Sequence, residues 1–96
     1  MYERRKYRAR HILVEDVDDA EYILERLSST DKFEDLAREF SECDSLHNGG
    51  DLGVFYSGQM DGVFEKAVHN LEEFEISKPI KTKHGFHIIQ RLPVKL

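Results

Sequence analysis

The segment from Tyr7 to Glu15 (YRARHILVE) constrains the fold most, because apolar residues occupy both of its alternating faces near its end. In a strand, Leu13 points to one face of the sheet, whereas Ile12 and Val14 point to the other. A strand with apolar residues on both faces is typical of the middle of a sheet, where both faces are covered. We therefore expect a central strand near the N-terminus.

Three later stretches carry apolar residues at positions i, i+3, i+4 and i+7, which is the spacing of a helix with one buried face. The stretches are Ala20, Ile23, Leu24 and Leu27; Phe33, Leu36, Ala37 and Phe40; and Phe64, Ala67, Val68 and Leu71. Acidic residues within 16–19 precede the first helix, where they suit its positive N-terminal end. Asp31 is the expected N-cap of the second helix, because Glu34 follows at capping-box spacing.

Further strand patterns complete the chain. Asp51–Tyr56 is a short β-like run, and Ile76–Ile80 is an extended segment whose proline favours an edge position. Residues 83–85 are typical of a hairpin turn before a last strand at 86–92. Helices between strands, with a hairpin at the end, indicate an α+β domain with a mixed or antiparallel sheet. We assign a single domain to residues 7–96, after a flexible N-terminal segment at 1–6.

The charge balance disfavours several classes of partner. Nineteen acidic residues against fourteen Lys and Arg give a formal net charge of −5, which suits neither nucleic acid nor an anionic membrane. No apolar stretch approaches the roughly 18 residues of a membrane span. A single cysteine cannot form an internal disulfide. We therefore expect a monomeric, cytoplasmic protein, with a domain excised from a longer exported protein as the alternative.

The stretch from Ser41 to Met60 is the candidate site, because it contains the only cysteine and four of the six glycines. Cys43 alone is more often an inert small hydrophobe than a reactive thiol. The spacings Cys43-x3-His47 and His84-x2-His87 resemble zinc ligands, but structural zinc sites usually bring two or more cysteines. A cysteine hydrolase is weaker still, because no residue is identified that would orient the histidine. We expect neither a metal nor a cofactor.

Five segments in register resemble the parvulin family of peptidyl-prolyl cis/trans isomerases. They are ARHILV, FEDLAREFSECDS, GGDLGVF, GQM followed by FEKA, and ISKPIKTKHGFHII, and together they extend over nearly all of residues 8–92. The resemblance implies a four-stranded antiparallel sheet surrounded by about four helices, within the FKBP-like superfold. One of these helices would be short and would fall within 43–48.

Position by position, the resemblance implies a catalytic set and a substrate-binding set. The catalytic set is His11, Cys43, Thr82 and His87. The substrate-binding set is Leu52, Phe55, Gln59, Met60, Phe64 and His84. In the family pattern, the hydroxyl at position 82 lies between the two histidines. The proline-ring pocket consists of residues 52, 60 and 64, with the aromatic residue at 55 beside it.

Plainer interpretations of the same residues remain open. His11 and His87 lie within strand patterns, where hydrogen-bonded core histidines are common, and Met60 and Phe64 are spaced as ordinary helix-facing core residues. Gln59 either binds the substrate backbone or caps the turn, and the second role is favoured. If the two histidines bond to each other, at least one must be neutral, so their protonation would matter near pH 6.5.

Two departures from the family pattern have physical consequences. Phosphoserine-directed parvulins carry a basic cluster just after the first strand, but the matching residues here are EDVDD at 15–19, which would repel a phosphate. We therefore expect an isomerase that is not specific for phosphoserine. The turn before the third strand usually contains glycine, and here it contains Phe74, so local strain is expected if that position needs a positive φ.

The implied reaction requires no bond to be broken. Rotation about an X–Pro bond meets a barrier of roughly 20 kcal/mol because the twisted amide loses its resonance. A dry apolar pocket favours the twisted form, which is less dipolar than the planar one. Cys43 either attacks the carbonyl carbon or, as we favour, forms a hydrogen-bonded floor with the histidines, since no oxyanion hole is evident.

The expected partners are unfolded or flexible polypeptides that contain X–Pro bonds, and the expected role is to assist protein folding. If the chain is an excised domain, the parent would be an exported foldase. The alternative function is a parvulin-fold chaperone or binding module that holds Pro-containing peptides with little turnover.

Overall fold

A computed structural model describes residues 5–94 of the 96-residue chain. Its elements are β1 (Lys6–Val14), α1 (Val17–Leu27), α2 (Phe33–Phe40), a short 3-10 helix η1 (Asp44–Asn48), β2 (Asp51–Tyr56), α3 (Gly62–Asn70), β3 (Ile80–Thr82) and β4 (Gly85–Leu92). The four strands form one antiparallel sheet in the order β2-β1-β4-β3. The expected α+β fold, with its central first strand and its short helix within 43–48, is confirmed.

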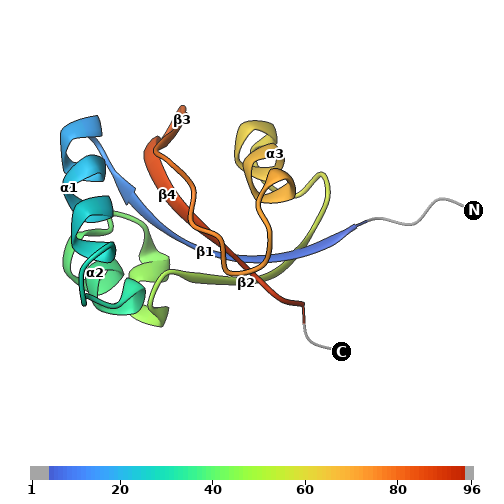
Figure 1. The fold of residues 1–96 in the computed structure, drawn as a ribbon. Coiled ribbons are helices and arrows are strands. Elements are labelled where there is room, and N and C mark those ends of the chain that lie inside the picture. The colour runs from blue at the N-terminus through green and yellow to red at the C-terminus, as the bar shows by residue number, and fades with distance from the viewer. Residues whose placement is uncertain (1–4, 95–96) are drawn as a thin grey trace, which may run out of the picture.

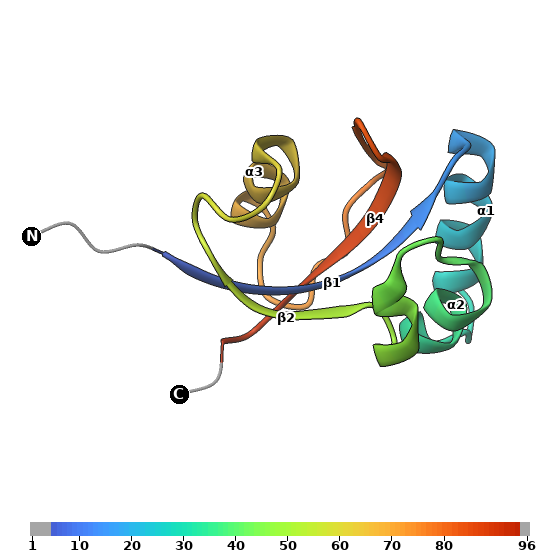
Figure 2. The same ribbon diagram turned by 180° about the vertical axis from the view of Figure 1, so that it is seen from behind.

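The sheet separates two hydrophobic cores (Figures 1 and 2). On one face, Ile12 and Ile88 pack against α1 and α2, which contribute residues such as Ile23 and Leu36. On the other face, α3 packs its apolar side against the sheet, and these residues include Tyr7, Ala9, Phe55, Phe64, Val68, Leu71 and Ile89. Neighbouring β4 residues 88 and 89 belong to different cores because side chains alternate along a strand. The three expected helical stripes therefore face two different sides of the sheet.

Two expected element boundaries are wrong. The N-cap position of α2 is Lys32 rather than Asp31, and α2 begins at Phe33. The carboxylate of Asp31 instead accepts a hydrogen bond from the side chain of Arg26 in α1, which removes it from the capping position. The N-terminal boundary also shifts, because Lys6 already pairs with Tyr56 in the β1–β2 ladder. Arg5 of the expected flexible segment is also held, because its carbonyl accepts a hydrogen bond from the Ser57 N–H at 2.9 Å, and residues 1–4 lie outside the described residues.

The edge of the sheet is shorter than the extended segment at 76–80 predicts. Only Ile80–Thr82 forms strand β3, whereas Ile76 makes an isolated bridge to Gln90 of β4. Pro79 lies between the two and cannot donate to a ladder, which explains the interruption. The hairpin turn before β4 is confirmed, since β3 and β4 pair directly across residues 83 and 84.

Phe74 has a φ of 70°, which is the left-handed conformation that its position was expected to need. Its side chain is 61% exposed, so little packing offsets the steric cost of a non-glycine residue there. Its backbone is nevertheless fixed to β4, because its carbonyl accepts a hydrogen bond from the Gln90 side chain at 2.9 Å. The strain is therefore held by the surrounding structure.

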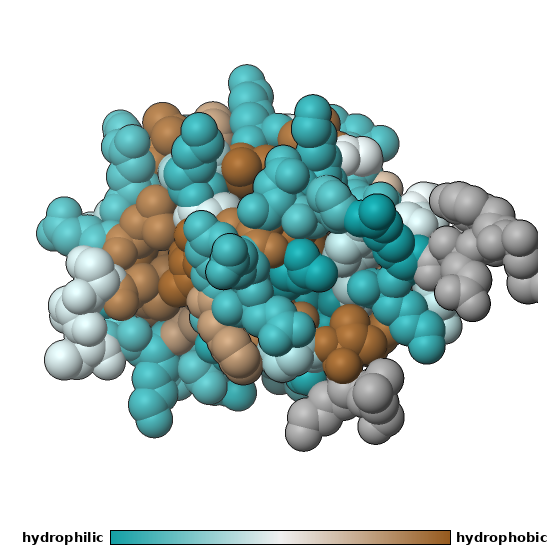
Figure 3. Space-filling view, turned by 45° about the vertical axis from the view of Figure 1, so that its right-hand side comes forward, coloured by the Kyte–Doolittle hydropathy of each residue, from teal (hydrophilic) through white to brown (hydrophobic). Residues whose placement is uncertain are grey.

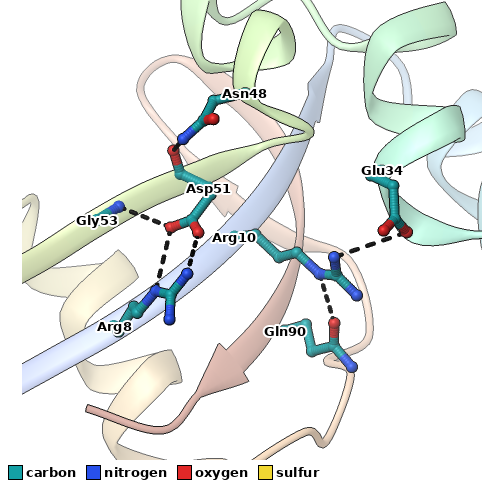
Figure 4. Close-up of polar contacts among 7 residues, drawn as sticks. All are labelled: Arg8, Arg10, Glu34, Asn48, Asp51, Gly53 and Gln90. Atoms are coloured by element: carbon teal, nitrogen blue, oxygen red, sulfur yellow. Dashed lines mark hydrogen bonds and ion pairs between the residues drawn. The ribbon is translucent and has the colours of Figure 1, made fainter. Parts of the chain in front are cut away.

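Polar side chains join strands on the face opposite α3 (Figure 4). Arg8 of β1 forms an ion pair with Asp51 of β2, and Asp51 also accepts a hydrogen bond from the Gly53 N–H at 2.8 Å. Arg10 donates to Gln90 of β4 at 2.6 Å. Arg10 also forms an ion pair with Glu34 of α2 at 3.7 Å, so these contacts link three neighbouring strands to one another and to α2.

Hydrophilic residues dominate the face shown in Figure 3, and the hydrophobic ones form separate patches among them. Among residues 5–94, no helix is long and apolar enough to cross a membrane.

Candidate active site

Two buried histidines from opposite ends of the chain meet on the α3 face of the sheet. His11 lies in β1 and His87 in β4, and each is only 4% exposed. Their Nδ1 atoms are 2.9 Å apart, and their rings are stacked with centroids 5.1 Å apart. Phe64 of α3 presents its ring edge-on to both histidines, with centroid distances of 5.5 and 5.3 Å. The ladder between β1 and β4 thus assembles the pair across 76 residues of sequence.

Both histidines are neutral at pH 7. Burial lowers the pKa of His11 to about 4, and the proximity of His87 lowers it further in the same direction. Burial likewise lowers the pKa of His87 to about 4, with a contribution from His84 that the Asp61 carboxylate partly opposes. In a neutral pair, one Nδ1 carries a proton and donates a hydrogen bond to the bare Nδ1 of the other ring. The two rings therefore act as one hydrogen-bonded unit.

Thr82 extends this unit, but from a position different from the expected one. Its Oγ1 lies 2.7 Å from Nε2 of His87 and accepts a hydrogen bond from the backbone N–H of His84 at 3.1 Å. The expectation that this hydroxyl lies between the histidines is wrong, because the histidines bond directly and Thr82 bonds to the far side of His87. Nε2 of His11 is buried and has no partner among the described residues.

A cavity of about 190 Å³ opens beside the histidine pair. Its lining residues are His11, Cys43, Leu52, Met60, Asp61, Phe64, His84 and His87. Seven of these eight belong to the sets that the sequence predicts. The cavity combines an apolar wall of leucine, methionine and phenylalanine with a neutral imidazole floor. We call it the proline pocket, after the proline ring that the family resemblance implies for residues 52, 60 and 64.

Three predicted residues do not line the proline pocket. Thr82 lies behind His87, as described above. Phe55 is 3% exposed in the core, where its ring lies 6.3 Å from that of Phe64 and supports the pocket wall from behind. Gln59 holds a turn, because its Oε1 accepts a hydrogen bond from the Tyr56 N–H at 2.8 Å. The structure thus places Gln59 as the turn-capping interpretation expects.

Asp61 lines the pocket and was missed from the sequence. It is the N-cap of α3, and its carboxylate accepts a hydrogen bond from the Val63 N–H at 2.8 Å. The available signal was its position between Met60 and Phe64, directly before a helical stripe. It is the one formally charged side chain in the lining of this pocket.

A tight glycine turn holds the loop with Cys43 and η1 against β1. Gly50 has a φ of 88°, and a Cβ at this position would lie 2.5 Å from the carbonyl oxygen of His11. The Gly50 carbonyl in turn accepts a hydrogen bond from the backbone N–H of His11 at 2.9 Å. Only glycine fits this approach, which positions the pocket wall relative to the histidine floor.

Cys43 lines the pocket, but no hydrogen bond joins its sulfur to either histidine among the described residues. Both Nδ1 atoms bind each other, and Nε2 of His87 binds Thr82. Within residues 5–94, no three His, Cys, Asp or Glu side chains gather in a way that would hold a metal ion. The two zinc-like spacings therefore do not produce a metal-binding cluster in the described chain.

The fold and this pocket define a peptidyl-prolyl isomerase domain of the parvulin type, and comparison with known proteins agrees. The family model for rotamases, described as PPIC-type PPIASE domain, matches residues 11–92. The chain therefore belongs to the PPIC-type peptidyl-prolyl cis/trans isomerase, or parvulin, family. Members of this enzyme class catalyse rotation about X–Pro bonds.

Individual members of the family show how similar the chain is to known proteins. It is 49% identical over 87 residues to foldase protein PrsA of Bacillus subtilis, and this match includes 90% of the chain and 30% of that protein. The crystal structure of PrsA from Bacillus subtilis superposes with a TM-score of 0.89 at 48% identity, which involves 93% of this chain and 35% of the other. The solution structure of the parvulin of Nitrosopumilus maritimus has a TM-score of 0.83 at 39% identity, over 97% of this chain and 100% of the other.

The chain spans about 30% of the length of the foldase proteins that it resembles. By contrast, it spans the whole of the Nitrosopumilus maritimus parvulin. The comparisons therefore support isomerase chemistry in this domain, together with a connection to protein folding.

Proposed function

We propose that this domain isomerises X–Pro bonds in unfolded or flexible polypeptides by holding the proline ring in the proline pocket. The apolar wall of Leu52, Met60 and Phe64 receives the ring, and the neutral His11–His87 pair lies beneath the amide that twists. The observation that carries the proposal is the proximity of this wall to two uncharged imidazoles in one cavity of about 190 Å³. An apolar wall over an uncharged imidazole floor favours the less dipolar twisted amide over either planar form, and the one formal charge in the lining, Asp61, is bound to the Val63 N–H at the start of α3.

The catalytic role of the histidines is to keep the pocket floor polar but uncharged. The two Nδ1 atoms are bonded to each other and Nε2 of His87 is bonded to Thr82. Among the described residues this leaves only the buried Nε2 of His11 without a partner, and no hydrogen bond joins it to Cys43. Thr82 orients His87, and His84 binds Thr82 through its backbone, so the floor is fixed before substrate arrives. Such preorganisation lowers the cost of reaching the twisted state.

Cys43 contributes to the pocket wall rather than forming a covalent bond. The described residues provide no base at hydrogen-bonding distance from its sulfur, which a nucleophilic mechanism would require. We expect Cys43→Ala to retain measurable activity and Cys43→Asp to be tolerated. Complete loss of activity in both variants, with folding intact, would contradict the non-covalent mechanism.

The end of the pocket near Cys43 is unsuited to a phosphate. The backbone N–H of Glu42 bonds to the carbonyl of Leu13 at 2.8 Å, which places the Cys43 loop beside the end of β1. Exposed Glu15 and Asp16 directly follow that strand. Since these carboxylates would repel a phosphoserine, we propose that the enzyme is not phosphoserine-specific. Fastest turnover of phosphoserine peptides in a panel that varies the residue before proline would refute this.

The relatives also support a proposal about the cellular setting of the domain. The expectation of a cytoplasmic protein finds no support among them, whereas the alternative of a domain from an exported foldase fits the foldase proteins that it matches. A further structural relative at 31% identity, with a TM-score of 0.85, comes from a study of SurA-like chaperones of Campylobacter jejuni that include a periplasmic protein. We propose that the domain acts as a monomeric unit on unfolded chains within such a foldase.

Exchange NMR on X–Pro tetrapeptides tests the function. The chain should accelerate cis/trans exchange, and Met60→Ala should lower kcat/KM by about tenfold because the ring loses part of its apolar wall. Val63→Ala is the matched control, since Val63 lies on the same helix but is 53% exposed and outside the pocket lining. No acceleration, together with peptide-induced shifts around Met60, would support the binding module instead.

A further inference from the structure

A second and larger cavity adjoins the proline pocket along α3. Its volume is about 530 Å³, and it lies between the start of β1, the turn after β2 and the outer side of α3. Met60 lines both cavities, so a polypeptide with its proline in the first can continue past Met60 into the second. The described contacts of the isomerase site leave this second cavity without a role.

The second cavity carries excess positive charge. Its lining includes Arg5 and Lys66 but only one carboxylate, Glu65. That carboxylate already accepts a hydrogen bond from the Gly58 N–H at 2.7 Å. Among the described residues, neither cation belongs to an ion pair: the observed pairs use four other arginines, at 8, 10, 26 and 38. This local balance is opposite in sign to the net charge of the chain, which is −5.

Arg5 is held in place and still has unused hydrogen-bond donors. Its backbone carbonyl accepts a hydrogen bond from the Ser57 N–H at 2.9 Å, which fixes it as a continuation of β1. Its Nη1 atom lies 3.0 Å from Nδ1 of His69, and the Tyr7 hydroxyl lies 2.9 Å from the same nitrogen. A guanidinium carries five N–H donors, and a neutral imidazole can accept only one. The remaining donors of the exposed Arg5 face solvent and suit a planar carboxylate.

From this geometry we infer that the cavity is a subsite for an acidic side chain of the same polypeptide whose proline lies in the proline pocket. The inference rests on the proposed function. Arg5 and Lys66 bind the carboxylate, and the Tyr7 hydroxyl and His69 form the polar floor beneath it. Because the rest of the chain is acidic, the subsite selects a single carboxylate near the proline rather than a polyanion.

Paired peptides test the subsite. A scan places glutamate at each position near the proline in turn, and each peptide is compared with its glutamine counterpart, with Kd measured by NMR titration and turnover by exchange NMR. At one or two positions the glutamate peptide should bind roughly fivefold more tightly than the glutamine peptide, as expected for two partly exposed ionic contacts. About 0.5 M salt should remove most of this ratio, because screening weakens exposed ionic contacts.

Substitutions test which side chains cause the preference for glutamate. Lys66→Gln and Arg5→Gln should each reduce the ratio towards one, and Lys66→Glu should invert it in favour of a peptide with lysine at that position. Lys78→Gln is the matched control, because Lys78 is an exposed lysine in the separate groove between α3 and β3 and should leave the ratio intact.

The outcomes separate the subsite from the function on which it rests. Equal Kd values at every scanned position, with turnover of the glutamine peptides, would overturn the subsite and leave the isomerase intact. A glutamate preference that persists in Lys66→Gln and Arg5→Gln, or that disappears in Lys78→Gln, would also overturn it. Absence of turnover for every peptide would instead refute the proposed function.

Discussion

Acidification should destabilise this domain through His11 and His87. Their pKa values are lowered from 6.5 to about 4, mainly by burial, so the folded state disfavours their protonation. In the unfolded chain the same side chains take up protons near pH 6.5. The stability gained from keeping them neutral is therefore fully present above pH 6.5, and it is lost as the pH falls from 6.5 towards 4.

The size of the effect follows from the two pKa values. At about pH 5, a group with a pKa of about 4 when folded and 6.5 when unfolded costs about 2 kcal/mol of stability, so the pair costs about 4 kcal/mol. A domain of this size is typically stable by roughly 5–15 kcal/mol. Mild acid should thus remove a large part of the unfolding free energy.

Urea unfolding followed by circular dichroism at several pH values between 7 and 5 measures this loss. The midpoint should fall while the slope with denaturant stays constant, because the surface exposed on unfolding does not change. His11→Asn should show about half of the wild-type pH dependence, since asparagine retains a polar partner for Nδ1 of His87 but does not titrate. NMR titration of the ring protons in the wild-type chain gives an independent readout that requires no variant.

Two results would contradict this reasoning. The first is a titration of either ring near the ordinary value of 6.5 in the folded chain. The second is an unfolding free energy that does not change between pH 7 and pH 5.

In addition, isomerase activity should be constant from neutral pH to about 5.5, because the floor of the pocket remains uncharged over that range. An inflection of kcat/KM near 6.5 would indicate that a histidine is charged in the free enzyme.

Three further substitutions test the backbone and the sheet, each by urea unfolding at pH 7. Gly50→Ala should lower the free energy of unfolding by about 3 kcal/mol, because the added Cβ meets the sheet backbone. Gly58→Ala is the control, also at positive φ but in open space, and it should lower that free energy by only about 1 kcal/mol. Equal losses would refute the clash. Phe74→Gly should stabilise the domain by about 1 kcal/mol by relieving its left-handed backbone, and a loss of stability would contradict this. Asp51→Asn should lower the free energy of unfolding by about 1 kcal/mol, because it breaks the ion pair with Arg8. Asp35→Asn breaks the exposed pair with Arg38 and should lower it much less. Similar losses would show that the Arg8–Asp51 pair does not stabilise the sheet.

Periodicity predicted the elements well because it records which faces are buried. The central position of β1 followed from apolar residues on both of its faces, and the structure places Ile12 and Ala9 in different cores. The helical stripes were equally readable. Periodicity does not show which face of the sheet a helix covers, so it did not show that α3 alone covers the face that holds the histidines.

Capping and hydrogen bonding were harder to predict because they depend on tertiary contacts. Asp31 has the spacing of an N-cap, but it pairs with Arg26, which folding brings close. Thr82 bonds to the far side of His87 because β3 pairs with β4 at that level of the sheet. In both cases a local pattern was correct about residue type, and the partner was decided by the packing of other elements.

The second cavity also depends on tertiary contacts and could not be predicted from local sequence patterns. Its cations, Arg5 and Lys66, lie in segments that the sequence describes as a polar N-terminal stretch and the exposed side of a helix. Neither segment is unusual on its own. Their joint position beside Met60 results from the pairing of β1 with β2 and from the packing of α3, and no motif records it.

The site depends on one of the two cores far more than on the other. Phe64 belongs to the core beneath α3, contacts both histidines edge-on and also forms the apolar wall of the proline pocket. The same side chain thus stabilises the fold and shapes the proposed substrate site, and His11 and His87 reach it only when β1 and β4 are paired. Any opening of α3 from the sheet would remove the pocket wall and admit water to the imidazole floor at once. Since water would favour the planar, more dipolar amide, the proposed mechanism requires the α3 core to stay closed, whereas the core beneath α1 and α2 supports the site only through the sheet.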